Sequence, residues 1–287
     1  MAAFACLALL GAPATASQSS RREVAQALFE QRALAGAIVV QDVRTGREIV
    51  SASIGEGARE LPLSVAKLLL VALYWEHRRE LPAPVAPDMD RIVALSADNP
   101  GRRLALELRE ALGSRPLLRD LARLGFPACT PARPRNCTTL AENSPASLWA
   151  ESLSLGEVGF RTTLPGLSRF LRMIGNGGVG ERGERVISAA TARLLRQAML
   201  RTVEAGTARR SRGRLRGLGR MGGKTGTGPA GPRPYDGIFA GLIFGNDGNA
   251  RFTVVTYVRR GGGGVVAAEI SAEMGARLLA GQSPARR

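Results

Sequence analysis

A serine and a lysine three residues apart, Ser64 and Lys67, open a strongly apolar segment of the sequence. On a helix, residues at this spacing share one face with their Cβ atoms about 5–6 Å apart, so the hydroxyl and the ammonium group can meet. A serine at a helix N-terminus also lies at the positive end of the helix dipole. Burial among the neighbouring leucines predicts a lowered Lys67 pKa, and a lysine of that kind can activate a serine nucleophile.

The other lysine is Lys224, because every remaining one of the 40 basic residues is an arginine. Lysine can give up its proton near neutral pH, whereas arginine cannot. Lys224 lies in the stretch Gly-Gly-Lys-Thr-Gly-Thr at 222–227, where glycines let a backbone come close and threonines offer hydroxyl groups from a strand edge. A cation there suits a substrate carboxylate. A phosphate-binding loop does not fit, since its glycine spacing and following helix are missing.

The order and separation of Ser-x-x-Lys and Lys-Thr-Gly resemble the penicillin-recognising serine acyltransferases, which comprise penicillin-binding transpeptidases and serine β-lactamases. Further stretches resemble the transpeptidase domains, so the resemblance covers most of residues 35–280. These stretches are 152–157, 162–164, 175–178, 204–208 and 236–241.

The resemblance implies roles for individual residues. It implies that Ser64 is the nucleophile, that Lys67 takes its proton, and that Ser96 passes a proton to the leaving amine. It implies oxyanion-hole donors in the backbone amides of Ser64 and Thr227. It also implies a group that binds the substrate, namely Asn99, Lys224, Thr225, Gly226 and Thr227.

The middle motif departs from the family pattern. Transpeptidases have Ser-x-Asn and class A β-lactamases have Ser-Asp-Asn, whereas this chain reads Ser96-Ala97-Asp98-Asn99. Alignment on Ser96 puts Asp98 where the asparagine belongs, and alignment on Asn99 puts Ala97 where the serine belongs. A one-residue bulge would bring Ser96 and Asn99 together. The displacement leaves open a catalytically impaired penicillin-fold module that binds or regulates, and an ordinary helix cap at this place.

Other known catalytic arrangements fit this sequence less well. A Ser-His-Asp triad would need His77, which lies on the same expected helix as Ser64 and about 20 Å away. The Tyr-x-Asn pattern of class C enzymes is missing, as is a glutamate followed four residues later by asparagine, the device of class A enzymes. A class D-like β-lactamase with a carbamylated Lys67 stays open. No metal or cofactor is expected.

Composition limits the class of partner. The chain has 287 residues, a formal net charge of +16 and 5% aromatic residues. The charge permits a nucleic-acid or anionic-surface partner, but so few aromatic residues argue against a base-stacking platform, and no nucleic acid is expected. Basic residues are densest at Arg209–Arg220. That segment is either a solvated loop or a contact to an anionic envelope surface.

The N-terminus and the cysteines indicate export. Residues 1–16 form an apolar run that closes on Ala-Thr-Ala, the small-x-small pattern of a signal peptide, although a basic n-region is missing. Removal of this segment leaves Cys129 and Cys137, for which a disulfide is predicted in an oxidising compartment. Free thiols or a metal site are the alternatives. The expected location is the periplasm or the cell envelope.

The elements that must position these groups follow from periodicity. Helices are expected at 21–34, 63–79, within 91–125, and at 164–174, 189–203 and 266–279; strands are expected at 37–43, 48–53, 237–244 and 252–259. Strands at both ends predict an α+β fold, an antiparallel sheet flanked by the terminal helices with an all-α insertion lobe. One transpeptidase-like domain would span 17–287, with a sheet lobe at about 21–62 and 205–280 and a helical lobe at about 63–204.

The resulting hypothesis is an exported serine D,D-transpeptidase-like protein that acts on peptidoglycan stem peptides through an acyl-serine intermediate, with β-lactams as inhibitors or substrates. A serine β-lactamase is the second hypothesis, and the binding or regulatory module is the third. A nucleic-acid binder would rest on charge alone.

Overall fold

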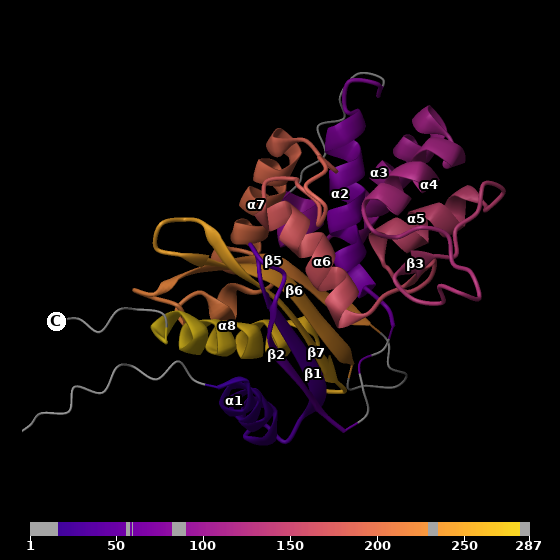
Figure 1. Cartoon of the computed structure of the whole chain (residues 1–287). Coiled ribbons are helices and arrows are strands. Elements are labelled where there is room, and N and C mark those ends of the chain that lie inside the picture. The colour runs from indigo at the N-terminus through magenta and orange to yellow at the C-terminus, as the bar shows by residue number, and fades with distance from the viewer. Residues whose placement is uncertain (1–16, 56–57, 59, 82–89, 229–234, 282–287) are drawn as a thin grey trace, which may run out of the picture.

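The computed structural model describes residues 17–55, 58, 60–81, 90–228 and 235–281 (Figure 1). The segment 1–16, for which a signal peptide is predicted, lies outside the described residues. Within the described part of the chain, none of the helices combines the length and the apolar character that a membrane crossing requires.

An antiparallel sheet of five strands forms the centre of the molecule (Figure 1). The strand order is β2-β1-β7-β6-β5, so the first and last parts of the chain pair through β1 and β7. This confirms the predicted α+β class. The strands are β1 (Ala35–Asp42), β2 (Glu48–Ile54), β5 (Gly219–Gly228), β6 (Asp236–Gly245) and β7 (Ala250–Arg259).

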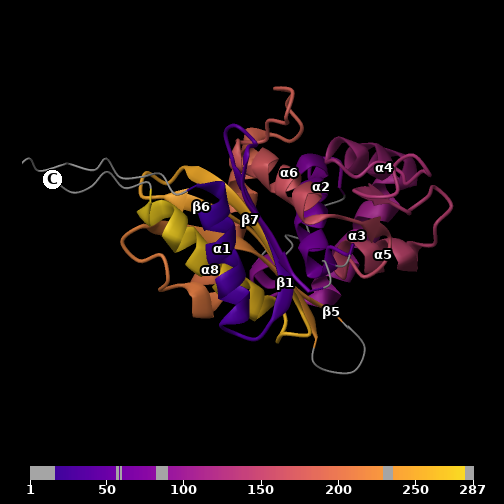
Figure 2. The ribbon, with the colours of Figure 1, turned by 60° about the horizontal axis from the view of Figure 1, so that its bottom comes forward.

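Both faces of the sheet are covered, because alternate residues of a strand point to opposite faces. On β1, Ile38 and Val40 pack toward the terminal helices, while Val39 packs toward the helical insertion. Figure 2 shows the terminal helices side by side on one face. These helices are α1 (Gln18–Glu30) and α8 (Gly264–Ala280).

The helical lobe is inserted between β2 and β5. A 3₁₀ turn leads into its central helix, and a π-helical turn precedes the next one. The lobe contains η1 (Leu63–Val65), α2 (Ala66–His77), η2 (Asp90–Ala94), α3 (Asp98–Leu112), α4 (Ser114–Arg123), α5 (Ala146–Ser154), α6 (Leu164–Gly175) and α7 (Ala189–Glu204). A short 3₁₀ turn, η3 (Arg209–Ser211), follows α7.

A small outlying sheet joins β3 (Cys137–Thr138) to β4 (Phe160–Arg161). The predicted disulfide is present beside it, between Cys129 and Cys137, with the two Cα atoms 4.9 Å apart. The bridge closes the arginine-rich loop between α4 and β3.

Candidate functional site

Ser64 lies in the 3₁₀ turn η1, at the entrance to α2, and its side chain is half-buried. Two neighbours fix this turn. The amide of Leu63 donates to the carbonyl of Gly156 at 3.2 Å. On the other side β5 comes so close that a Cβ on Gly226 would lie 2.8 Å from Leu63 Cβ and 3.1 Å from the Ser64 amide nitrogen. The glycine of the Lys-Thr-Gly stretch therefore permits the contact between the sheet and the turn that carries Ser64.

Lys67 is fully buried in the first turn of α2, and its side chain faces Ser64. Its Nζ donates to Ser64 Oγ at 3.1 Å and to Asp98 Oδ1 at 2.7 Å. Burial lowers the pKa of Lys67, while the hydrogen bond and the charge of Asp98 act in the opposite direction. The predicted serine–lysine pair is thus formed, and a carboxylate joins it.

The second lysine contacts the middle motif. Lys224 is fully buried on β5, and its Nζ donates to Ser96 Oγ at 2.7 Å and to the carbonyl of Thr225 at 2.7 Å. Burial holds the pKa of Lys224 well below its usual range, and the positive charge of Lys67 adds to this effect. Ser96 adopts a left-handed backbone conformation, with φ at +59°. Backbone strain of this kind is frequent at functional sites.

Thr207 connects the Ser96 segment to β5. Its amide donates to the carbonyl of Ala94 at 2.9 Å, and its Oγ1 shares a 2.6 Å hydrogen bond with Thr225 Oγ1. Gly206, just before it, packs so closely that a Cβ would lie 2.2 Å from the Ala94 carbonyl oxygen. In the sequence, the stretch 204–208 stands out only because it resembles transpeptidase domains, and no role for Thr207 was predicted.

The threonines of β5 lie on the other face of the strand from Lys224 and Gly226, as strand alternation requires. Thr225 is buried against Thr207. Thr227 is exposed, and its Oγ1 accepts a hydrogen bond from the Gly264 amide at the start of α8, at 3.0 Å. The structure therefore joins Lys224 to Ser96, while the hydroxyl groups of both threonines contact neighbouring protein atoms.

The middle motif contacts both lysines through two different residues. Ser96 contacts Lys224, and Asp98 contacts Lys67. Asn99 lies exposed in the first turn of α3. Ser96 and Asp98, two residues apart, therefore each contact one of the two buried lysines.

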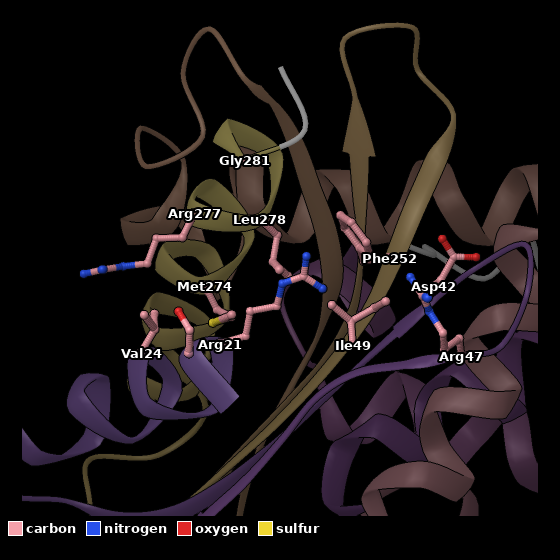
Figure 3. Close-up of a pocket in the computed structure, with 11 residues that line it drawn as sticks. Arg21, Val24, Asp42, Arg47, Ile49, Phe252, Met274, Arg277, Leu278 and Gly281 are labelled. Carbon is pink, nitrogen blue, oxygen red and sulfur yellow. The ribbon is translucent and has the colours of Figure 1, made fainter. Parts of the chain in front are cut away.

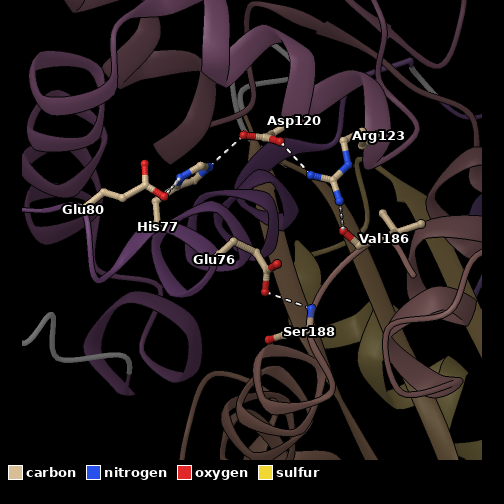
Figure 4. A network of polar contacts seen from close by, with 7 residues as sticks. All are labelled: Glu76, His77, Glu80, Asp120, Arg123, Val186 and Ser188. Carbon is tan, nitrogen blue, oxygen red and sulfur yellow. Dashed lines mark hydrogen bonds and ion pairs between the residues drawn. The ribbon is translucent and has the colours of Figure 1, made fainter. Parts of the chain in front are cut away.

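His77 lies at the far end of α2 from Ser64, as the sequence predicted. Its Nε2 is 2.7 Å from Asp120 Oδ2 and its Nδ1 is 3.2 Å from Glu80 Oε1 (Figure 4). Asp120 also pairs with Arg123, whose guanidinium donates to the Val186 carbonyl. This polar network connects α2, α4 and the segment before α7. It shares no residue with the Ser64 group, which consists of Ser64, Lys67, Ser96, Asp98 and Lys224.

A cavity of about 260 Å³ lies elsewhere, between α1, α8 and the sheet (Figure 3). Its walls are mainly apolar and include Ile49, Phe252 and Met274, with arginines around them such as Arg21. None of the residues of the Ser64 group lines it. We assign the candidate chemistry to the Ser64 group because two serine hydroxyls are hydrogen-bonded to the two buried lysines there.

The arginine segment, Arg209–Arg220, runs along the surface from η3 into the start of β5. Its six arginines are all exposed. Arg214 is paired with Glu273 and also lies 3.8 Å from Glu269, both on α8.

The sequence matches no known family model and no curated protein. Solved structures with the same fold are transpeptidase domains. The transpeptidase domain of FtsI4 from Legionella pneumophila has a TM-score of 0.72 and 18% identity, over 91% of this chain and 94% of that one. The transpeptidase domain of penicillin-binding protein 3 from Burkholderia pseudomallei has a TM-score of 0.68 and 20% identity, over 94% and 96%. Penicillin-binding protein 3 from Mycobacterium tuberculosis has a TM-score of 0.68 and 18% identity, over 92% and 77%. The chain therefore has the penicillin-binding transpeptidase fold.

Proposed function

We propose that this protein is a serine D,D-transpeptidase-like acyltransferase that acts on peptidoglycan stem peptides through an acyl-Ser64 intermediate. One observation carries the proposal: Ser64 and Lys67 are hydrogen-bonded to each other, and so are Ser96 and Lys224, on a transpeptidase fold. The two lysines are the only ones in the chain, and both are fully buried in this group.

Acylation follows from the geometry of Ser64 and Lys67. With Lys67 neutral, its Nζ accepts the proton of Ser64 Oγ, and the oxygen attacks the carbonyl carbon before the terminal residue of the stem peptide. A bond forms between Oγ and this carbon, and the C–N bond to the terminal residue breaks. The amides of Ser64 and Thr227 are the proposed donors to the oxygen that becomes negative.

The leaving amine nitrogen takes a proton from Ser96 Oγ. Ser96 is reprotonated through Lys224, to which it is hydrogen-bonded. Lys67 then passes the proton that it took from Ser64 on to Lys224, so both lysines regain their starting states and the net result moves one proton from Ser64 to the departing amine. The proposed binding region for the terminal carboxylate lies along β5 at Lys224, Thr225, Gly226 and Thr227, and the ammonium form of Lys224 would attract the carboxylate.

The proposed location is the periplasm or the cell envelope, on the apolar pattern of residues 1–16 and the bridged cysteines. The stem peptide is the proposed substrate, and β-lactams are the proposed inhibitors. The exposed arginine segment suits contact with an anionic envelope surface.

Hydrolysis of a penicillin acyl-enzyme is the second candidate, and Glu157 is the observation that favours it. Burial raises the pKa of Glu157, and Lys67 and Asp98 are close enough to influence it. Arg161 stands four residues after Glu157, where class A enzymes have asparagine. We expect a stoichiometric burst with penicillin and slow release. Sustained turnover above about 1 per second that is lost in Glu157→Gln would favour the β-lactamase instead.

The proposal is tested with a synthetic stem peptide that ends in D-alanyl-D-alanine, with and without an amine acceptor. We expect release of D-alanine and, with the acceptor present, formation of the transfer product. Both must be absent in Ser64→Ala. Release that persists in Ser64→Ala, or no release by the wild type, would contradict it.

A further inference from the structure

The Asp98 carboxylate lies 2.7 Å from the buried ammonium of Lys67, which itself lies 3.1 Å from Ser64 Oγ. We propose that Asp98 is a positioning residue that raises the proton occupancy of Lys67 and thereby moves the acidic limb of Ser64 acylation to higher pH. The inference rests on the proposed function for its kinetic part only, because proton occupancy can be measured without any reaction.

Asp98 dominates the charges around Lys67. From α3 come Asp98 and Arg102, from the segment after α5 comes Glu157, and β5 contributes Lys224. The hydrogen bond and the charge of Asp98 are the strongest influences that keep Lys67 protonated, while burial and Arg102 favour the neutral amine. Replacement of this one carboxylate should therefore change Lys67 most.

Charge and hydrogen bonding can be separated at this position. Asparagine has nearly the same shape as aspartate and keeps an oxygen that accepts from Lys67 Nζ, but it carries no charge. A neutral partner no longer stabilises the ammonium form, so Lys67 loses its proton at lower pH. Ser64 needs a neutral Lys67 as its base. The acidic limb of the acylation profile must therefore shift to lower pH by the same amount as the titration midpoint of Lys67.

The side chain of Asp98 is 52% exposed, and this exposure limits the size of the effect. A close opposite charge shifts a pKa by about one to three units, and solvent screening favours the lower end of that range. We expect the Lys67 midpoint to fall by about one pH unit in Asp98→Asn. Acylation below the wild-type midpoint should then be about tenfold faster.

The chain makes the direct measurement simple, since it contains only two lysines. Protein labelled with ¹³C at lysine Cε gives two resonances, and Lys67→Arg and Lys224→Arg identify them. The Lys67 resonance is titrated in the wild type, in Asp98→Asn and in Glu110→Gln. Glu110→Gln is the matched control, because it removes an exposed carboxylate from the same helix. The rate of acylation by a penicillin is measured over the same pH range.

The inference is supported if the Lys67 midpoint shifts to lower pH in Asp98→Asn but not in Glu110→Gln, and if the acidic limb of acylation shifts with it. An unchanged or raised midpoint overturns it. Folded Asp98→Asn protein that has lost acylation at every pH also overturns it, because the carboxylate would then be needed for the reaction itself. If the wild type is never acylated while the midpoint still falls, the proposed function fails and the electrostatic role of Asp98 stands.

Discussion

Ser96 combines a strained backbone with a hydroxyl that contacts a buried lysine. Its φ of +59° lies in the region that favours glycine, and its Oγ accepts from Lys224 Nζ at 2.7 Å. A non-glycine residue in this conformation costs free energy, which is tolerated where function needs the side chain. The hydroxyl of Ser96 therefore has a role that glycine could not fill.

We expect Ser96→Gly to keep the fold, because glycine adopts this φ without strain. Its acylation by penicillin should be at least about 100-fold slower, which is the usual scale for the loss of a proton-transfer group. Stopped-flow acylation and urea unfolding measure the two effects. Ala33→Gly is the matched control, since Ala33 has φ at +51° outside the site. Equal acylation rates in Ser96→Gly and the wild type would exclude Ser96 from proton transfer.

At the scale of elements, the 3₁₀ turn η1, which carries Ser64, is fixed between β5 and the segment after α5. Leu63, just before Ser64, also has a positive φ of +51°. Gly156 accepts its amide hydrogen bond, and a Cβ on Gly156 would lie 2.1 Å from the Leu63 carbonyl oxygen. The position of Ser64 thus depends on a glycine far away in sequence.

Gly156→Ala should displace η1 and slow the acylation of Ser64. This effect comes in addition to the stability that is lost because alanine disfavours a positive φ. The matched control is Gly177→Ala, because Gly177 has a similar φ of +69° and open space where its Cβ would be. Both variants should lose about 1–2 kcal/mol of stability for the left-handed residue, and Gly156→Ala should lose more. Urea unfolding and penicillin acylation are the measurements. Indistinguishable variants would show that the contact with Leu63 does not position Ser64.

The disulfide between Cys129 and Cys137 constrains the loop before β3. We expect the double variant Cys129→Ser/Cys137→Ser to lose about 2.5 kcal/mol of unfolding free energy, the loop-entropy value for so short a ring. Acylation of Ser64 should be unchanged, because the bridge lies outside the Ser64 group. Denaturant unfolding of oxidised and double-variant protein tests this. Equal stabilities would show that the bridge does not restrict the unfolded chain.

The elements and the site could be predicted to different degrees. Periodic apolar residues indicated α6, α7, β6 and β7 to within a few residues. The full extent of β5 was missed, because its glycines have low strand propensity and become a strand only by pairing with β6. The contact of Asp98 with Lys67 could not be decided from spacing, since it depends on how η2 directs the chain into α3.

At the scale of the whole molecule, the chain carries an excess of positive charge. The formal net charge is +16, and the arginine segment contributes six exposed guanidinium groups. Arg214 is the one of them that pairs with glutamates of α8. A field of this kind attracts anionic surfaces and weakens with salt.

We expect the protein to bind vesicles that contain phosphatidylglycerol and to leave neutral vesicles unbound. Glutamine in place of the five other arginines of the segment should reduce cosedimentation at least tenfold, since each basic residue near such a surface contributes about 1 kcal/mol. These are Arg209, Arg210, Arg212, Arg216 and Arg220.

The matched control changes five exposed arginines elsewhere to glutamine, so the net charge falls equally. These are Arg119, Arg133, Arg182, Arg185 and Arg193. If both sets reduce binding to the same extent, overall charge rather than the arginine segment attracts the vesicle.

The measurement that tests the central claim most directly is the mass and position of a penicillin adduct. The account predicts one adduct per chain with the full mass of the β-lactam, since ring opening adds the whole molecule to a hydroxyl. Peptide mapping should place it on Ser64, and it should be absent in Ser64→Ala and persist for minutes in the wild type. An adduct on another residue, or none at high penicillin concentration, would contradict the assignment of Ser64 as the nucleophile.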